Sequence, residues 1–292
     1  MKKALFLYNP QSGRGRIEQH KEKIVEIFQA ADYAIEPVEI DFGKNPFAGH
    51  EDLDLAVVAG GDGTVNFAVN RLRELGLNPP IGIIPAGTAN DFAGAVGMSK
   101  DPIEAARQIA TGTVEHLDCG CVNGLYFVNI FSFGLFTTTS QHTSDENKHR
   151  WGKLAYIAEG LKELRRMHRI PLSIEADGKK LALDALIVLL FNGETAGGFH
   201  LARRSSVKDG LFDLLILEKR NFLVSCWAMI RFLLGGRPRS VRHLRAAHLT
   251  ITSTIAEPTD VDGQRGAEFP LTIECLKGTL PIQCAPHQPN NQ

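Results

Sequence analysis

The sequence predicts an α/β domain followed by a β-rich domain, and two observations support this prediction. In the N-terminal part, three short apolar runs each end in a polar, glycine-containing loop and lead into a helical stretch, as parallel strands joined by helices do. From about residue 118, short alternating segments are separated by turn residues, as in a β-sandwich. We therefore expect a three-layer α/β domain over residues 1–117 and a β-sandwich over residues 118–276 of the 292-residue chain.

The composition is that of an ordinary globular protein. Hydrophobic residues make up 43% of the chain and charged residues 22%, and the net charge of -1 argues against nucleic acid as a partner. The cysteines lack zinc or thioredoxin spacing, and we expect Cys119 and Cys121 to be core residues of a strand in a reducing compartment. No run of about 18 apolar residues is present, so we expect a cytoplasmic protein.

The first apolar run is Ala4–Tyr8, and an amphipathic helix is predicted over about Arg16–Ala30. The loop between them, Asn9-Pro10-Gln11-Ser12-Gly13-Arg14-Gly15, carries hydroxyl, amide and basic side chains. The next strand is predicted over Ala34–Ile40. This part of the chain therefore has the order strand, polar loop, helix, strand.

The chain is organised around a second loop, Gly60-Gly61-Asp62-Gly63-Thr64. It follows a buried strand over Leu55–Ala59 and precedes a helix expected over Val65–Leu75. The glycines allow the backbone to approach a ligand, and the N-terminus of a helix favours an anion such as phosphate. A bare Asp62 carboxylate would repel phosphate, so the segment indicates a Mg-nucleotide. The alternative for this loop alone is a tight structural turn.

A third loop, Pro85-Ala86-Gly87-Thr88-Ala89-Asn90-Asp91, follows a strand over Ile81–Ile84, and a helix is expected to open near Asp91. A further helix is predicted over Pro102–Thr111. In a parallel sheet the three loops meet at the carboxyl edge, where α/β folds bind ligands. Together they predict a nucleotide site, although the chain contains neither the Walker A pattern nor the dinucleotide fingerprint.

The second half of the chain is predicted to be mostly strands. Helices are expected over about Trp151–Met167 and Phe222–Leu234, and a polar loop over Thr137–Arg150. A frayed tail is expected from Pro286. The predicted strands are Val114–Asp118, Leu125–Phe133, Leu172–Ala176, Leu181–Leu190, Leu211–Leu217, Ala247–Thr252 and Glu268–Leu276.

Four ordered motifs give the chain a resemblance to a known family. They are Asn9-Pro10-x-Ser12-Gly13, Gly60-Gly61-Asp62-Gly63-Thr64, Pro85-x-Gly87-Thr88-x-Asn90-Asp91 and Lys208-Asp209-Gly210-x-x-Asp213. In this order they resemble the diacylglycerol kinase-like lipid kinases, whose relatives include sphingosine and ceramide kinases. The resemblance covers nearly the whole chain. It implies an ATP-binding α/β domain, a β-sandwich, a cleft between them, and a return of residues from about 277 to 292 to the first domain.

The resemblance also implies roles for individual residues. Asp91 and Asp118 are similar to carboxylates near the active-site metal, and Asp62 is expected to act in catalysis. Asp209, with the backbone carbonyls of Ser206 and Leu211, resembles a second, structural metal site. The nucleotide contacts that the resemblance implies are Asn9, Ser12, Gly13, Gly60, Gly61, Asp62, Gly63, Thr64, Val65, Asn66 and Thr88.

The chain departs from the family pattern in three places. Phe67 stands where Glu is usual, and Ala202-Arg203-Arg204 replaces a segment with proline. Gln264 follows Asp262-Gly263 where the family has the Glu that acts as general base. Asp260, Asp262 and Glu268 are candidate substitutes, although Asp262 resembles a structural Asp of the family.

These residues predict an ATP- and Mg²⁺-dependent lipid kinase that is slowed by the Gln at position 264. The alternatives are an NAD kinase-like enzyme and a catalytically inactive nucleotide-binding regulator. The lipid substrate is expected at a membrane surface, so the protein is expected to associate peripherally with the membrane. The sequence leaves open whether the protein forms a homodimer. The helix Phe222–Leu234 and the arginines at 231, 237, 239, 242 and 245 are expected to contact the bilayer, or alternatively to be a packed helix and a solvated loop.

Overall fold

The computed structural model describes residues 1–134, 168–196, 199–200, 202, 205–233, 236 and 238–285. The chain forms two compact units, which are described separately. Unit 1 comprises residues 1–119 and the end of the last strand from Lys277, and unit 2 comprises residues 120–276. The chain passes between the units in two long strands, β5 (Thr113–Val122) and β17 (Leu271–Cys284).

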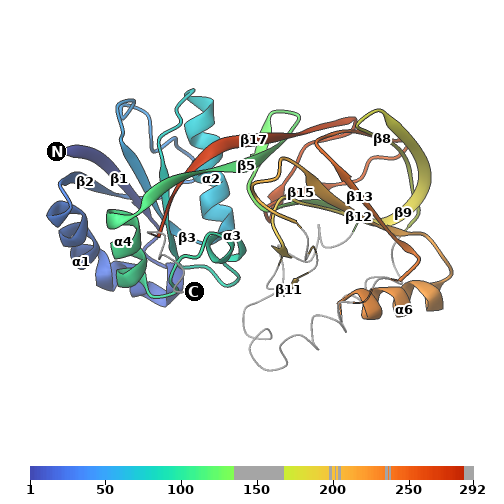
Figure 1. The fold of residues 1–292 in the computed structure, drawn as a ribbon, viewed down its shortest axis with the longest axis horizontal. Coiled ribbons are helices and arrows are strands. Elements are labelled where there is room, and N and C mark those ends of the chain that lie inside the picture. Colours follow the sequence, from blue (N-terminus) through green and yellow to red (C-terminus); the bar gives the residue numbers. More distant parts are fainter. Residues whose placement is uncertain are drawn as a thin grey trace, which may run out of the picture. The chain divides into compact units, whose positions relative to one another are not determined.

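Unit 1 contains a parallel sheet in the order β2-β1-β3-β4-β17. Helices cover both faces of this sheet, with α1 packed beside α4 and α2 beside α3 (Figure 1). The central strand β3 is buried along its whole length, as its continuous apolar run predicts. The elements are β1 (Lys2–Tyr8), the short 3-10 helix η1 (Ser12–Gly15), α1 (Arg16–Ala30), β2 (Tyr33–Glu39), β3 (Leu55–Gly60), α2 (Asp62–Glu74), β4 (Ile81–Pro85), α3 (Asp91–Ala95) and α4 (Pro102–Thr111).

Helices α1 and α4 have the predicted bounds, whereas α2 begins earlier than the predicted Val65. Gly61 is extended and caps α2, and its carbonyl oxygen accepts hydrogen bonds from Thr64 N (2.9 Å) and Val65 N (3.1 Å). Asp62, Gly63 and Thr64 therefore form the first helical turn and are not part of a loop. The predicted start of the helix is therefore too late, because glycine has a low helix propensity.

Unit 2 is built from antiparallel strands that enclose an apolar core. The long strand β9 belongs to both layers of the sandwich: its first half pairs with β8, and its second half pairs with β12 and β7. The elements are β6 (Leu125–Phe127), β7 (Ile130–Phe133), β8 (Ile170–Ala176), β9 (Lys179–Phe191), β10 (Thr195–Ala196), β11 (Phe199–His200), β12 (Phe212–Glu218), α6 (Phe222–Leu233), β13 (Val241–Ala246), β14 (His248–Ser253), β15 (Thr259–Val261) and β16 (Gln264–Arg265).

The strand predicted over Leu125–Phe133 is wrong as a single element, because the structure divides it into β6 and β7. The carboxylate of Asp262 causes the interruption. It accepts hydrogen bonds from the backbone N–H groups of Val128 (2.7 Å), Asn129 (3.1 Å) and Ile130 (2.8 Å). The Asp262 side chain, which is distant in the sequence, thus accepts the backbone hydrogen bonds that a neighbouring strand would otherwise accept.

Two strands that connect the units are longer than predicted. Strand β5 extends to Val122, so Cys119 is buried within it and Cys121 is half-buried. Strand β17 extends to Cys284, and Ile282 pairs with Ile81 of β4 in unit 1.

Several predicted features lie outside the described residues. They are the loop Thr137–Arg150, the helix Trp151–Met167, Arg203-Arg204, Arg237 and the tail from Pro286. Among the helices that the structure does describe, none is both long and apolar enough to cross a bilayer.

Candidate functional site

The three glycine loops follow β1, β3 and β4, which are adjacent parallel strands of unit 1. Their carboxyl ends therefore lie at the same edge of the sheet, as predicted. Gly60 O accepts a hydrogen bond of 2.9 Å from Ala86 N, which joins the second and third loops. A Cβ atom on Gly13 would lie 3.7 Å from both Cβ and O of Ala86, so the first loop also reaches this point.

The second and third loops touch through their backbones at Gly61 and Gly87. A Cβ on Gly87 would lie 2.4 Å from Gly61 Cα and 2.9 Å from Asn90 Oδ1, both too close for any real contact. Asn90 closes the third loop, because its Oδ1 accepts from Gly87 N (2.7 Å) and its Nδ2 donates to Gly87 O (2.9 Å). Glycine at 87 is therefore required by a close approach of two backbones.

Gly60 is required for a similar reason at the end of β3. A Cβ there would lie 2.4 Å from Cβ of Thr64. The Thr64 side chain thus covers the glycine, in the first turn of α2. The positive end of the α2 dipole opens at this turn and favours an anion.

Asp62 joins the starts of α2 and α3. Its Oδ1 accepts a hydrogen bond from Phe92 N (2.9 Å), and its Oδ2 accepts one from Asp91 N (3.1 Å). α3 has no cap from its own N-cap residue, Asn90, so Asp62 supplies the cap from the neighbouring helix. The sequence did not predict this contact, since Asp62 was expected to face only the nucleotide.

Burial raises the pKa of the Asp62 carboxyl, and the negative charge of Asp91 raises it further. The backbone donors Phe92 and Asp91 act in the opposite direction, but the net pKa is raised. Two carboxylates thus lie near each other at the loops. A cation or another positive group would relieve their repulsion.

The other residues predicted to contact the nucleotide differ in how far their side chains are exposed. In the first loop, Asn9 Oδ1 accepts from Gln11 N (2.9 Å) and Asn9 O accepts from Ser12 N (2.9 Å), so the loop is braced before Gly13. Thr88 is exposed on the third loop. The side chains of Val65 and Asn66 are buried in unit 1, so any contact that they make with a nucleotide would come from their backbone.

The structure places Asp118 within β5, almost completely buried. Its Oδ1 accepts a hydrogen bond of 2.9 Å from Gly278 N, so Asp118 joins β5 to β17. Among the described residues, no group of three or more His, Cys, Asp or Glu side chains could hold a metal. Asp118 is therefore not part of a carboxylate cluster with Asp62 and Asp91.

Phe67, which stands where the family has Glu, is buried on α2. Phe42 packs edge-on against its ring at 5.0 Å between centroids, and the Arg71 guanidinium lies over it at 5.0 Å. Phe67 thus makes aromatic and cation–π contacts within unit 1 and offers no carboxylate at this position.

Gln264 lies in unit 2, exposed on the β15–β16 hairpin. Asp262 and Gly263 form its two-residue turn with φ of 48° and 86°, the backbone that Asp-Gly favours. Val261 pairs with Gln264, and Asp260 pairs with Arg265, so strand alternation directs Asp260 and Gln264 to opposite faces of the hairpin. Burial raises the pKa of Asp260.

The aspartate predicted to hold a structural metal already has protein partners. Asp209 Oδ1 accepts from Leu211 N (3.0 Å), and Asp209 Oδ2 forms an ion pair with Arg245 Nη2. Ser206 and Leu211 were expected to contribute backbone carbonyls, so the hydrogen bond from Lys208 N to Ser206 Oγ (3.3 Å) does not bear on their predicted role. No local pattern in the sequence predicted that an arginine from β13 would reach this aspartate.

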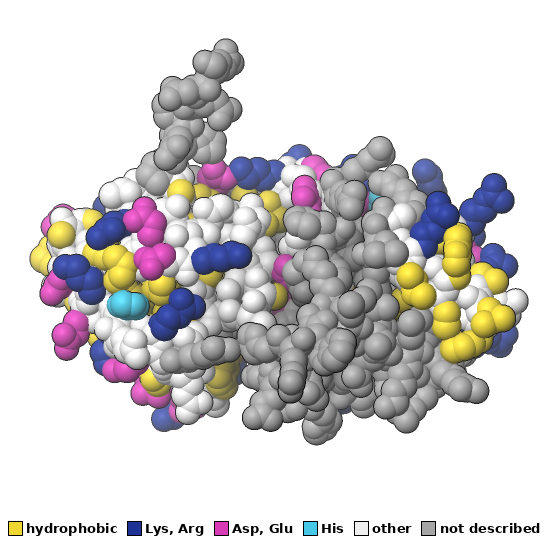
Figure 2. Space-filling model, turned by 90° about the horizontal axis from the view of Figure 1, so that it is seen from below, with side chains coloured by type: hydrophobic (Ala, Val, Ile, Leu, Met, Phe, Trp, Pro, Cys, Tyr) yellow, Lys and Arg dark blue, Asp and Glu magenta, His cyan; other side chains and the backbone are white. Residues whose placement is uncertain are grey.

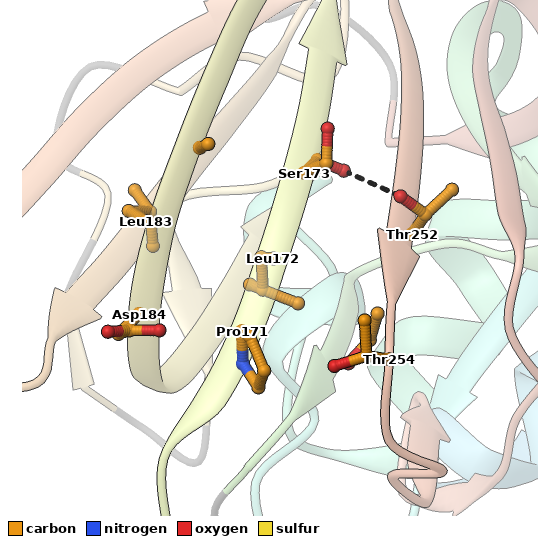
Figure 3. A pocket seen from close by; sticks show the side chains of 9 residues that line it. Pro171, Leu172, Ser173, Leu183, Asp184, Thr252 and Thr254 are labelled. Atoms are coloured by element: carbon orange, nitrogen blue, oxygen red, sulfur yellow. Dashed lines mark hydrogen bonds between the residues drawn. The ribbon is translucent and has the colours of Figure 1, made fainter.

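An open pocket of about 430 Å³ lies elsewhere in unit 2, between β8, β9 and β14 (Figure 3). Thr252 Oγ1 donates a hydrogen bond of 3.4 Å to Ser173 O at its wall. None of the predicted site residues lines it. The lining residues are Pro171, Leu172, Ser173, Ala182, Leu183, Asp184, Thr252, Ser253 and Thr254.

A parallel α/β unit with three touching glycine loops, together with an antiparallel sandwich, defines a two-domain kinase class. The comparisons agree. Residues 3–122 match the diacylglycerol kinase catalytic domain, and residues 130–284 match the YegS C-terminal NAD kinase beta sandwich-like domain.

Relatives and solved structures match over nearly the whole chain. A diacylglycerol kinase of Bacillus subtilis (strain 168) is 34% identical over 92% of this chain and 92% of its own, and one of Staphylococcus carnosus (strain TM300) is 32% identical over 96% and 94%. A crystal structure from Bacillus anthracis str. Sterne has a TM-score of 0.81 at 28% identity, covering 97% of this chain and 95% of that chain. Another from this organism, of a diacylglycerol kinase, has a TM-score of 0.74 at 25% identity and covers 97% of both chains. The chain belongs to the diacylglycerol kinase family and is a lipid kinase.

Proposed function

We propose that the protein transfers the γ-phosphate of ATP to the hydroxyl of a diacylglycerol-like lipid at a membrane surface. The observation that carries this proposal is the meeting of the three glycine loops at one edge of the parallel sheet of unit 1. The names of the relatives favour a lipid acceptor over the NAD acceptor that the Gly-Gly-Asp-Gly motif also allows.

The loops offer ATP the groups that phosphates need. Gly60, Gly61 and Gly87 leave room for the backbone to approach the phosphates, and the N-terminus of α2 favours negative charge there. Asn9, Ser12 and Thr88 supply amide and hydroxyl groups around this point. Phosphoryl transfer depends mainly on such positioning and on neutralising charge.

Mg²⁺ fits the carboxylates present. It commonly uses one or two carboxylates, with phosphates and water as the other ligands. Asp62 and Asp91 are close enough for the charge of Asp91 to raise the pKa of Asp62, so a cation would stabilise both carboxylates. When bound with ATP, Mg²⁺ would neutralise charge on the transferred phosphate.

Among the described candidates around the β15–β16 hairpin, none is placed as a general base. Gln264 cannot take up a proton at neutral pH, and both oxygens of Asp262 are occupied by backbone N–H groups. Asp260 lies on the opposite face of the hairpin, and Glu268 pairs with Arg265 at 3.4 Å. In a loose transition state the hydroxyl proton leaves late, to water or phosphate oxygen, so we expect a slow but genuine kinase.

Helix α6 is the surface that we assign to the membrane. Ala228 and Met229 pack into a buried cluster of unit 2. The opposite side exposes large apolar side chains, and arginines lie nearby (Figure 2). These side chains are Phe222, Leu223, Val224, Trp227 and Ile230, with Leu223 78% and Trp227 53% exposed.

The arginines around α6 contribute less than the sequence indicated. Arg242 pairs with Glu218, and Arg245 pairs with Asp209. Arg231 lies over the Trp227 ring at 5.1 Å, and Arg239 is exposed. The apolar face is therefore the main part of the proposed contact, with a smaller electrostatic part.

The test is phosphorylation of a lipid panel with γ-labelled ATP and Mg²⁺ in mixed micelles. The panel holds diacylglycerol, monoacylglycerol, sphingosine and ceramide, with NAD as a non-lipid acceptor. We expect label on diacylglycerol. Label on NAD alone would contradict the proposal, and ATP binding without label on any acceptor would favour the inactive regulator.

A further inference from the structure

The sequence predicted a divalent cation at Asp209, and the residues present do not fit it. A Mg²⁺ or Ca²⁺ ion is held by six or more oxygen atoms, of which carboxylates supply the charge. Asp209 Oδ2 forms an ion pair with the guanidinium of Arg245, and this positive charge would repel a divalent cation beside the same carboxylate, while Asp209 Oδ1 accepts from Leu211 N at 3.0 Å.

A second carboxylate belongs to the same cluster. Asp213, at the start of β12, is only 1% exposed, and it is the cross-strand partner of Arg245 on β13. Arg245 Nε lies 3.5 Å from Asp213 Oδ2, and His243 Nε2 contacts Asp213 Oδ1. The guanidinium of Arg245 thus contacts both Asp209 and Asp213.

A buried carboxylate needs a positive partner or a metal, because an isolated charge away from water is very costly. Arg245 meets this need for two carboxylates at once, since its planar fork can bind through separate nitrogen atoms. It also connects the turn at Asp209, which leads into β12, with the neighbouring strand β13.

We propose that the guanidinium of Arg245 takes the place of a structural divalent cation in this protein. It neutralises Asp209 and Asp213 and holds the Lys208–Gly210 turn against β13. The stability of this turn and of its packing against β13 then does not depend on a metal.

The first experiment needs no variant. The melting temperature of the full-length protein is measured without nucleotide after dialysis against EDTA, and again with added MgCl₂ or CaCl₂. We expect the same melting temperature in all three conditions. A melting temperature that falls in EDTA and is restored by either ion would overturn the proposal.

The second experiment compares Arg245→Met with Arg242→Met. Arg242 lies on the same strand and pairs with Glu218, which keeps Arg220 at 2.8 Å when Arg242 is removed. Removing Arg245 leaves the buried carboxylate of Asp213 without its arginine partner. Arg245→Met should therefore lower the melting temperature by about 5 °C, and Arg242→Met by clearly less. Equal losses in the two variants would contradict the assignment of Arg245.

The third comparison asks whether the emptied position accepts an ion. Added CaCl₂ or MgCl₂ should raise the melting temperature of Arg245→Met while leaving that of Arg242→Met and the wild type unchanged. Arg245→Lys should lie between the wild type and Arg245→Met, because a lysine keeps the charge but not the fork. An Arg245→Lys protein as unstable as Arg245→Met would argue against charge neutralisation as the role.

Discussion

The carboxylate of Asp62 accepts a hydrogen bond of 2.9 Å from the backbone N–H of Phe92, thirty residues away in the sequence. This contact makes Asp62, the first residue of α2, also the cap of α3. A substitution at Asp62 therefore acts on stability and on catalysis together, and the two effects need separate controls.

Asp62→Ala should abolish phosphoryl transfer and also destabilise the protein. The loss of a helix cap costs about 0.5–2 kcal/mol in the free energy of unfolding. Asp101→Ala is the matched control, because Asp101 caps α4 through Ile103 N and Glu104 N, outside the site. It should lose similar stability in urea unfolding and keep its turnover. An active Asp62→Ala enzyme would remove Asp62 from the mechanism.

Gly87→Ala should weaken ATP binding, because the new Cβ would lie 2.4 Å from Gly61 Cα and force two loops apart. Overpacking costs about 1–3 kcal/mol in free energy. If about 1.4 kcal/mol of this cost falls on the ATP-bound state, the affinity for ATP falls tenfold. Gly94→Ala is the control, since no atom lies within 4 Å of its added Cβ. Titration calorimetry should show unchanged ATP affinity for Gly94→Ala. Equal affinities for both variants would mean that the contact between the loops does not shape the nucleotide site.

Gln264→Glu should accelerate phosphorylation of the lipid if the position is an impaired base. General base catalysis contributes roughly 10²–10⁴-fold, and the gain should grow as the pH rises through the pKa of the new carboxyl. Gln29→Glu, on the exposed side of α1, makes the same change of charge away from the hairpin. Rates are measured with labelled ATP over a range of pH. Equal rates for wild type and Gln264→Glu would mean that Gln264 only orients other groups.

Asp260 should make the protein less stable as the pH rises. Burial raises its folded-state pKa above that of an ordinary aspartate, so its contribution to stability is present below the unfolded pKa and is lost as the pH rises through the folded pKa. Asp260→Asn can still accept from Gly263 N and should gain stability relative to wild type between pH 4 and pH 7.

The control for this experiment is Asp41→Asn. The backbone N–H of Gly43 lowers the pKa of Asp41, so this carboxylate contributes stability above its unfolded pKa that is lost as the pH falls through the folded pKa. The difference between Asp41→Asn and wild type should therefore change with pH in the opposite direction. A pH-independent difference for Asp260→Asn in urea unfolding would refute the raised pKa.

Removing the apolar face of α6 should weaken membrane binding. In vesicle sedimentation with anionic phospholipid, the double variant Leu223→Gln, Trp227→Gln should bind several-fold less than wild type, because each apolar side chain removed loses favourable transfer free energy. The control replaces Val114 and Leu125, which are exposed apolar residues outside α6. Wild-type binding should fall moderately with salt, as about 1 kcal/mol per nearby basic residue is screened. Equal binding by the two double variants would exclude α6 as the contact.

The sequence by itself determined the parts that depend on neighbours in the chain. The apolar run Leu55–Ala59 was predicted to be a buried strand, and the helix Pro102–Thr111 was predicted to the residue. The glycine loops were found from local spacing, and their position at the carboxyl edge followed from the general behaviour of parallel sheets. These features arise from propensities and periodicity within a few turns.

Tertiary structure decided which polar groups meet. Asp62 caps α3, Asp262 divides β6 from β7, and Arg245 reaches Asp209, each through partners that lie 29 to 134 residues apart. No local pattern encodes such a pairing, because a carboxylate takes whatever donor the packed fold brings to it. The sequence therefore specified where the charged groups are, and only the packing of distant elements settled which contact each one makes.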